Sequence, residues 1–196
     1  VMPGSIKIDD GSGNYTILTN AGSLGSDRTL TIPNETGTML TTGGAMFDIW
    51  RQTADRTGSA TDYELTSNWE RVDDATIGFI GTGMSESSGI FTFPQTGIYK
   101  ITFSLEVKND TTTDGVQAQI KATTNNSSYS TIILREISIR SSGDTEEGYA
   151  ITTFDCTDTS THKLKFVAAD FKSSTQMNGS STNSETYVIF ERLGDT

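Results

Sequence analysis

The sequence has little of several residue types on which common functions depend. Its one cysteine, Cys156, excludes an internal disulfide and any metal site built from several cysteines. Its one histidine, His162, likewise excludes zinc or di-iron centres rich in histidine. No apolar run reaches the roughly 18 residues that a membrane-spanning helix needs, so we expect no membrane insertion.

Positive charge is also scarce, with 14 Lys and Arg residues against 25 Asp and Glu and a formal net charge of −11. This charge repels nucleic-acid phosphates, and no Lys/Arg cluster offsets it, so we expect no nucleic-acid partner. Threonine and serine are abundant instead, at 33 and 22 residues of 196. Threonine favours strands because its branched β-carbon packs well on a pleated surface.

Residues 1–45 differ from the remainder of the chain. Two short apolar runs, Ser5–Ile8 and Tyr15–Leu18, stand among turn-forming Gly, Asn and Asp residues. So short a segment cannot bury a core of its own. We therefore predict an extended, strand-rich attachment or stalk segment that needs a partner, and a separate domain over residues 46–196. An arm on that domain, a disordered tether and one third of an intertwined stalk all remain open for the segment.

From Phe47 onward, short strands alternate with polar turns. Ile98–Val107 is the longest, with apolar residues on one face and mainly polar residues on the other, as in an antiparallel strand with one buried face. Nine or ten such strands without a helical period predict an all-β sandwich or barrel. The other expected strands are Phe47–Trp50, Trp69–Val72, Ile77–Ile80, Gly89–Phe93, Val116–Ala122, Thr131–Ile139, Gly148–Phe154, Lys163–Phe171 and Thr186–Arg192.

The segment from Gly89 to Phe103 reads GIFTFPQTGIYKITF and resembles the signature of C1q/TNF-like domains, an aromatic strand, a Pro/Gly turn and a second aromatic strand. The turn is longer than the Pro-Gly pair of that family. The last strand, Tyr187–Leu193, resembles the apolar strand that ends those domains. The residues that match are Phe91, Pro94, Gly97, Tyr99 and Phe103.

This resemblance implies a jelly-roll sandwich that assembles as a compact homotrimer and that binds proteins or glycans through loops or grooves between subunits. It implies binding and not catalysis, although some members of the family hold calcium. The mildly polar second face of Ile98–Val107 fits partial burial between subunits. Strand alternation leaves open whether the main aromatic candidates serve as core or as subunit contact: Phe91, Tyr99, Phe103, Tyr187 and Phe190.

A second resemblance lies in the N-terminal part. Asp27–Thr42, DRTLTIPNETGTMLTT, is similar to a segment that recurs in bacteriophage tail fibres and related virion proteins, with Asn34 where Asp is commoner. It implies a location on the surface of a virion and contacts with other virion proteins through the N-terminal segment.

Residues suited to catalysis or metal binding occur without a supporting pattern. His162 follows Asp158–Thr161 in a turn and reads as a surface histidine, while Cys156 near a strand end reads as a small buried side chain. Gly81–Ser85 is rich in glycine but lacks the Lys-Ser/Thr of a phosphate-binding loop. The Asp73–Asp74 turn is expected to be solvated. We assign no catalytic residue, cofactor or metal ligand.

The longest polar segments are the candidate ligand loops, since Asn, Ser, Thr and Tyr suit adaptable hydrogen bonding to sugars or proteins. The same composition also suits an inert surface. The loops are Thr53–Asn68, Asn109–Gly115, Thr123–Ser130 and Ser173–Ser184, and the candidate contact residues are Tyr63, Asn109, Tyr129 and Asn178.

Three functional hypotheses follow. The first is a trimeric phage fibre or decoration protein whose head binds a host-surface glycan or protein, or stabilises the particle. The second is a polysaccharide-cleaving fibre enzyme, because the separation of a carboxylate pair is not visible in sequence. The third is a secreted C1q-like binding module.

Overall fold

The computed structural model describes residues 6–9, 12, 15–18, 45–58, 60–109, 114–172 and 174–196. The chain divides into two compact units, Val1–Thr38 and Met39–Thr196. In the first unit, β1 (Ile6–Asp9) and β2 (Tyr15–Leu18) pair antiparallel. The Asp27–Thr42 segment lies outside the described residues, and the predicted boundary after residue 45 stays a prediction.

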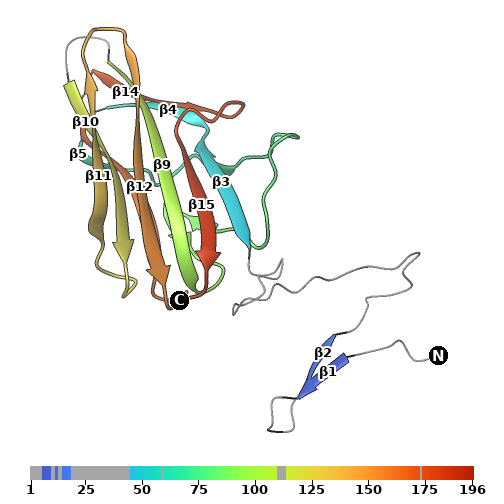
Figure 1. Ribbon diagram of the computed structural model, residues 1–196. Helices are drawn as coiled ribbons and strands as arrows, with labels where there is room; N and C mark the ends of the chain where they lie inside the picture. The colour runs from blue at the N-terminus through green and yellow to red at the C-terminus, as the bar shows by residue number, and fades with distance from the viewer. Residues whose placement is uncertain are drawn as a thin grey trace. The chain divides into compact units, whose positions relative to one another are not determined.

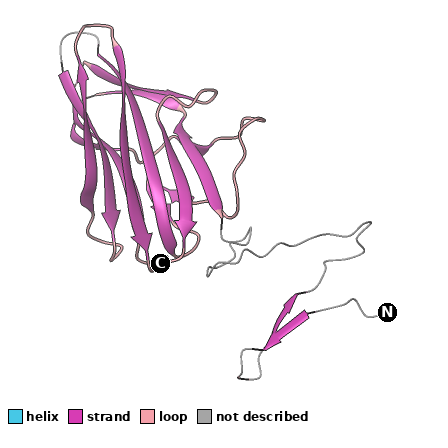
Figure 2. Ribbon diagram, viewed as in Figure 1, coloured by secondary structure: helices cyan, strands magenta, loops and turns pink. Residues whose placement is uncertain are grey.

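The second unit consists of strands in two antiparallel sheets (Figures 1 and 2). Its described residues contain no helix, and therefore no apolar helix of membrane-spanning length. One sheet has the order β11 (Ser130–Ile139), β10 (Asp114–Thr123), β13 (Lys163–Phe171), β8 (Ile90–Thr92), β7 (Ser85–Ser87), and β5 (Ala60–Glu64) also pairs with β13.

The other sheet has the order β4 (Ala54–Thr57), β14 (Thr175–Ser180), β9 (Gly97–Asn109), β15 (Tyr187–Gly194), β3 (Met46–Gln52), β6 (Trp69–Arg71). The strand β12 (Thr145–Cys156) pairs along β9 from Gly97 to Lys108. We refer to the two layers as the six-stranded and the seven-stranded sheet. This arrangement confirms the all-β jelly-roll prediction.

The core lies between the two sheets. On β9 the predicted apolar face is fully buried, with Tyr99, Ile101, Phe103, Leu105 and Val107 all at 0% exposure. Phe166 on the six-stranded sheet packs across to the seven-stranded sheet, its ring centroid 5.1 Å from that of Phe103 and 5.9 Å from that of Phe190. Phe91 lies 5.2 Å from Phe166. The interlocked aromatic rings fix the two layers against each other.

The turn that exceeds the family pattern, Pro94–Gly97, is held by its own hydrogen bonds. The Tyr99 hydroxyl donates to the Gln95 carbonyl at 2.8 Å, and Arg192 Nε donates to the Thr96 carbonyl at 3.0 Å. Gly97 has a φ of 143°, and a β-carbon there would lie 2.5 Å from Arg192 Nε. Only glycine fits at this position.

Three sequence expectations about strands and loops were wrong. Ile77–Ile80 is a loop in which only Ile80 bridges to a strand residue, Phe47, because β6 already occupies the other half of that edge of β3. Thr53–Asn68, expected to be a loop, contains β4 and β5, and Ser173–Ser184 contains β14. These polar segments form strands because each finds a pairing partner, β4 and β9 for β14 and β13 for β5, while Met177 points into the core.

Candidate functional site

The outward face of the seven-stranded sheet carries a row of apolar side chains across four strands. Ile151 on β12 lies opposite Thr102 on β9, which lies opposite Ile189 on β15, and Ile189 lies opposite Ile49 on β3. Because all four residues are in register, their side chains stand on the same side of the sheet. The row therefore forms one continuous strip of surface.

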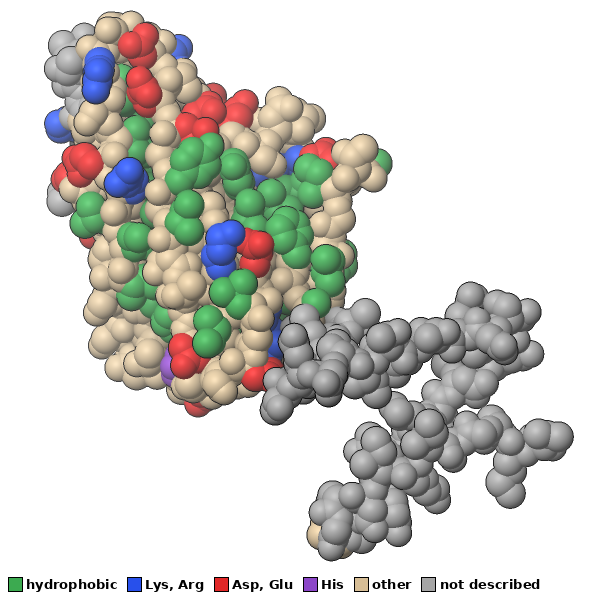
Figure 3. All heavy atoms as spheres, in the orientation of Figure 1, with side chains coloured by type: hydrophobic (Ala, Val, Ile, Leu, Met, Phe, Trp, Pro, Cys, Tyr) green, Lys and Arg blue, Asp and Glu red, His purple; other side chains and the backbone are tan. Residues whose placement is uncertain are grey.

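Further apolar side chains extend this strip toward the strand ends. Tyr149, Ile151 and Leu193 are 44%, 50% and 56% exposed, and Ile98 is also exposed. Figure 3 shows hydrophobic side chains gathered over this face of the molecule. Contiguous apolar surface of this kind is typical of an interaction site. We refer to the outward side of β12, β9, β15 and β3 as the contact face.

An ion pair lies within the contact face. Lys100 Nζ on β9 is 2.6 Å from Glu191 Oε2 on β15, and these two residues are direct cross-strand neighbours. Glu191 in turn lies opposite Phe47 on β3. The opposite charges neutralise each other, so this polar row adds no net charge to the face.

On the other side of the apolar strip from this ion pair, the next row of cross-strand neighbours is polar and carries no charge at its centre. Tyr149, Ser104 and Tyr187 are opposite one another, and the Ser104 hydroxyl donates to Glu147 at 2.5 Å. Hydrogen bonding to the Glu147 carboxylate, followed by burial and the neighbouring Tyr187, raises the pKa of Tyr149 above its usual value. Tyr149 therefore keeps its proton and serves as a hydrogen-bond donor at neutral pH.

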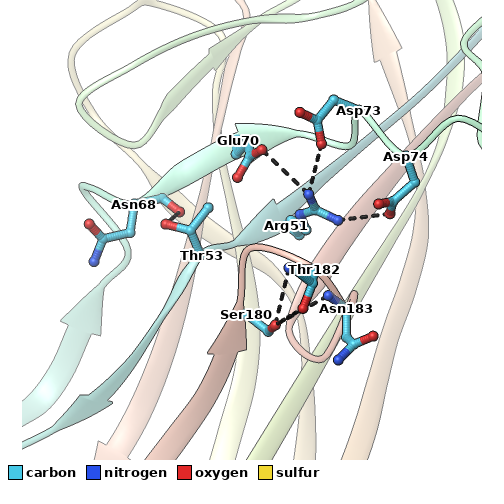
Figure 4. Close-up of polar contacts among 9 residues, drawn as sticks. All are labelled: Arg51, Thr53, Asn68, Glu70, Asp73, Asp74, Ser180, Thr182 and Asn183. Atoms are coloured by element: carbon cyan, nitrogen blue, oxygen red, sulfur yellow. Dashed lines mark hydrogen bonds and ion pairs between the residues drawn. The ribbon is translucent and has the colours of Figure 1, made fainter.

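Arg51 on β3 ends this row and is 1% exposed. Its guanidinium lies 2.8 Å from Asp74, 2.9 Å from Asp73 and 3.4 Å from Glu70 (Figure 4). The Asp73–Asp74 turn is solvated as expected, with the Asp73 side chain 74% exposed, and its carboxylates also fasten the turn onto β3. The arginine compensates part of the acidic charge beside the contact face.

The neighbouring edge of the sandwich is open. Among the described residues, β12 pairs only with β9, and β11 pairs only with β10. A groove of about 450 Å³ lies between β11 and β12, lined by residues of both strands that include Arg135, Ile137 and Tyr149. Gly148 lets the strands approach, since a β-carbon there would lie 2.4 Å from Ile137 Cγ1. Unpaired strand edges of this length are places where other chains dock.

The aromatic residues expected to form either the core or a subunit contact fall into two groups. Phe91, Tyr99, Phe103 and Phe190 are fully buried between the sheets, whereas Tyr187 lies on the contact face. The side chains that dominate this face, Tyr149, Ile151 and Ile189, were missed as site residues. The available signal was Gly148–Phe154, which carries apolar side chains in both phases of its alternation and so has no wholly polar face.

The four candidate ligand residues lie on three strands and the β10–β11 turn, and only β9 and β14, which carry Asn109 and Asn178, are paired with each other. Tyr63 is on β5, with its ring packed against Phe171 at 5.7 Å. Asn109 ends β9 and is fully buried, and Asn178 on β14 donates to Glu106 at 2.8 Å. The ring of Tyr129 lies under Lys165 Nζ at 4.5 Å. The structure does not gather them into one binding surface.

His162 and Cys156 lie near each other in the fold but are not arranged as a nucleophile and its base. The expectation of a surface histidine was wrong: His162 is 9% exposed, its ring lies 5.7 Å from that of Phe154, and its two nitrogens contact the hydroxyls of Thr157 and Thr161. Burial raises the pKa of the Cys156 thiol to about 11, which keeps it protonated and unreactive. Within the described part of the chain, no three His, Cys, Asp or Glu side chains are grouped to hold a metal ion.

Comparisons with known proteins bear on the fold. No family model matches the sequence, and no curated protein matches it. Among solved structures, murine APRIL at pH 5.0 is similar, with a TM-score of 0.52, 14% identity, and coverage of 76% of this chain and 99% of that one. Eiger TNF from S. frugiperda is similar with a TM-score of 0.56, 9% identity, and coverage of 78% and 95%. At these identities the likeness shows the fold alone: the chain folds as a jelly roll like that of these TNF-like structures.

Proposed function

We propose that the chain is a subunit of a homotrimeric binding module whose jelly rolls pack through the contact face. The observation that carries this proposal is the strip of Ile151, Ile189 and Ile49 in register on the outward side of the sheet. The resemblance to C1q/TNF-like domains supports the number three. Binding in preference to catalysis is supported by the same resemblance.

Burial of this strip between copies stabilises the assembly against its charge. Each fully buried Ile or Leu side chain contributes about 1.5–3 kcal/mol when it leaves water. Three chains at −11 each carry −33, and this charge opposes association. The internal Lys100–Glu191 and Arg51–carboxylate pairs keep that repulsion away from the centre of the contact.

Native mass spectrometry and light scattering of the full chain test the trimer. The wild type is expected at about 63 kDa, three times 21.1 kDa. Ile151→Asp places an unpaired charge in the contact face and is expected to weaken the trimer at least 100-fold while circular dichroism stays β-rich. The matched control, Gln117→Asp on the six-stranded sheet, is expected to remain trimeric. A wild type that stays near 21 kDa at micromolar concentration contradicts the proposal.

We further propose that the trimer is a virion component, a fibre or decoration protein at the particle surface, which its N-terminal segment joins to other virion proteins. The support is the similarity of Asp27–Thr42 to phage fibre segments. The head would bind a host-surface glycan or protein, or stabilise the particle. Immunogold labelling of purified particles tests the location, and tail, baseplate or capsid genes beside the coding sequence are expected. Absence of label from intact particles would refute it.

A further inference from the structure

The loop Ile77–Ile80 exposes large apolar side chains at the edge of the seven-stranded sheet formed by β3 and β6. Phe79 and Ile80 are 57% and 53% exposed, and Ile77 is exposed as well. From Ala75 to Ser85 the chain carries no charged residue. A surface loop of this composition is out of place on a chain with a net charge of −11 unless it meets another surface.

The loop is rigidly built. Ile80 and Phe47 exchange two backbone hydrogen bonds of 2.9 and 3.1 Å. Asp48, fully buried, accepts from the Met84 amide at 2.8 Å and from Arg71 Nε at 2.8 Å. The Arg71 guanidinium lies 5.4 Å from the centre of the Phe79 ring. Phe79 is therefore held in place and presented to solvent, which lowers the entropy lost on binding.

Two glycines make this anchoring possible. A β-carbon at Gly83 would lie 2.4 Å from Asp48 Oδ2, and one at Gly81 would lie 2.3 Å from the Ala45 carbonyl oxygen. The backbone therefore lies directly against β3 and its buried carboxylate. The loop also extends the contact face. Ile80 pairs with Phe47 of β3 through an isolated bridge, and Phe47 lies opposite Glu191 of β15.

The opposite edge of the sandwich carries the other unexplained apolar residues. Ile132 and Leu134 are exposed on β11, the edge strand of the six-stranded sheet, and Leu134 lies opposite Gln119 of β10. The strand orders place β11 and β12 at one side of the sandwich and β6 with the loop at the other. The loop and the Ile132–Leu134 patch are therefore at opposite edges of one chain and can meet only between two copies.

The contact face supplies one part of the area that a ring of three copies needs. Four strands about 4.8 Å apart and seven residues at roughly 3.3 Å each cover on the order of 400 Å² of sheet plane. A stable interface takes about 800 Å² from each partner, and in a ring this face is shared between two neighbours. The lateral edges have to supply further area, and the loop and the Ile132–Leu134 patch are apolar surfaces available there.

From these observations we propose that the Ile77–Ile80 loop of one copy docks on the β11–β12 edge of the next copy, against Ile132 and Leu134. The contact is head-to-tail, with a different surface from each partner, as closed rings require. This inference rests on the proposed trimer and specifies how its neighbouring subunits are joined.

Photo-crosslinking in the full-length assembly tests the inference. Phe79 is replaced by p-benzoylphenylalanine, and crosslinked peptides are mapped after irradiation. Crosslinks between chains are expected within Ser130–Ile139 or on β12. The control carries the same group at Asp62, on the solvent face of the six-stranded sheet, and is expected to give no crosslinks between chains. Crosslinks from position 79 to other regions, or a trimer without any, overturn the loop contact and leave the trimer standing. A monomeric wild type overturns both.

A variant that combines Ile77→Ser, Phe79→Ser and Ile80→Ser gives an independent measure. Because these side chains are exposed, the fold is expected to persist by circular dichroism. The trimer is expected to dissociate at a concentration at least 10-fold higher than the wild type does. An unchanged dissociation midpoint in a folded variant contradicts the inference.

Discussion

The solvent faces of the two sheets differ in what covers their strands. The six-stranded sheet carries ion pairs across its strands, Lys121 with Asp62 at 2.7 Å and Lys165 with Glu64 at 3.0 Å. The seven-stranded sheet instead carries the strip around Ile151, with one ion pair embedded in it. Both faces belong to the same sandwich and enclose the same core. Stability of the fold therefore does not explain the apolar face, which the proposed trimer would cover.

The largest effect expected from a substitution lies in the core that both sheets share. Phe166→Ala removes the ring between Phe91, Phe103 and Phe190 and is expected to lower the free energy of unfolding by about 3–5 kcal/mol. Ile151→Ser on the contact face is expected to change the stability of the isolated fold by only about 0.5 kcal/mol. Urea unfolding at several protein concentrations distinguishes the stability of the isolated fold from the stability that assembly adds. Equal decreases in the free energy of unfolding for the two variants at low protein concentration would contradict the difference between the core and the contact face.

A smaller effect is expected from alkaline pH, through groups inside the sandwich. Burial raises the pKa of Tyr99 to about 12 and that of Cys156 to about 11, from 10.0 and 9.0. The unfolded chain loses these protons first, so stability present below pH 9 falls as the pH rises through 11, by about 2 kcal/mol for the thiol and about 1 kcal/mol for the phenol. Denaturant unfolding between pH 8 and pH 11 measures the loss. Cys156→Ala is expected to remove the part that begins at pH 9, and an unchanged profile in that variant would count against the thiol.

The smallest effects distinguish two ion pairs of similar length. Lys121→Ala on the six-stranded sheet breaks a solvent-exposed pair and is expected to cost less than about 1 kcal/mol and to leave assembly unchanged. Lys100→Ala leaves the Glu191 carboxylate unpaired in the contact face and is expected to weaken the trimer roughly 10-fold. Dissociation on dilution, followed by light scattering, gives both values. Identical midpoints would show that the two faces are equivalent.

Much of the fold could be predicted from local pattern. The alternation on Ile98–Val107 correctly indicated which side of β9 is buried, and the aromatic–turn–aromatic segment indicated the jelly roll. The polar strands β4, β5 and β14 were missed, because their Thr, Asn and Asp residues are typical of turns and only pairing partners make them strands. The opposite error was made at Ile77–Ile80, where a strand was predicted and the structure has a loop. An apolar run forms a strand only where the edge of another strand is free to pair with it.

The candidate site was much less accessible than the fold. Tyr187 was identified among the aromatic candidates, and its odd spacing from Phe190 puts the two on opposite faces of the strand, but nothing local shows which face the core covers. The buried Asp48 and Arg51 likewise look like ordinary charged residues of a short strand. Their partners come from a segment about 20 to 36 residues further along the chain, and sequence spacing does not report such contacts.

The sequence by itself determined the class of this protein: a strand-forming, acidic chain without a disulfide, a histidine-rich metal centre or a basic surface. These properties follow from residue types and from the period of two, which act locally. The tertiary structure alone decided that Ile151, Thr102, Ile189 and Ile49, separated by up to 140 positions, stand in one row on the outside of the sheet. Strand register sets such a row, and register depends on how the whole chain pairs.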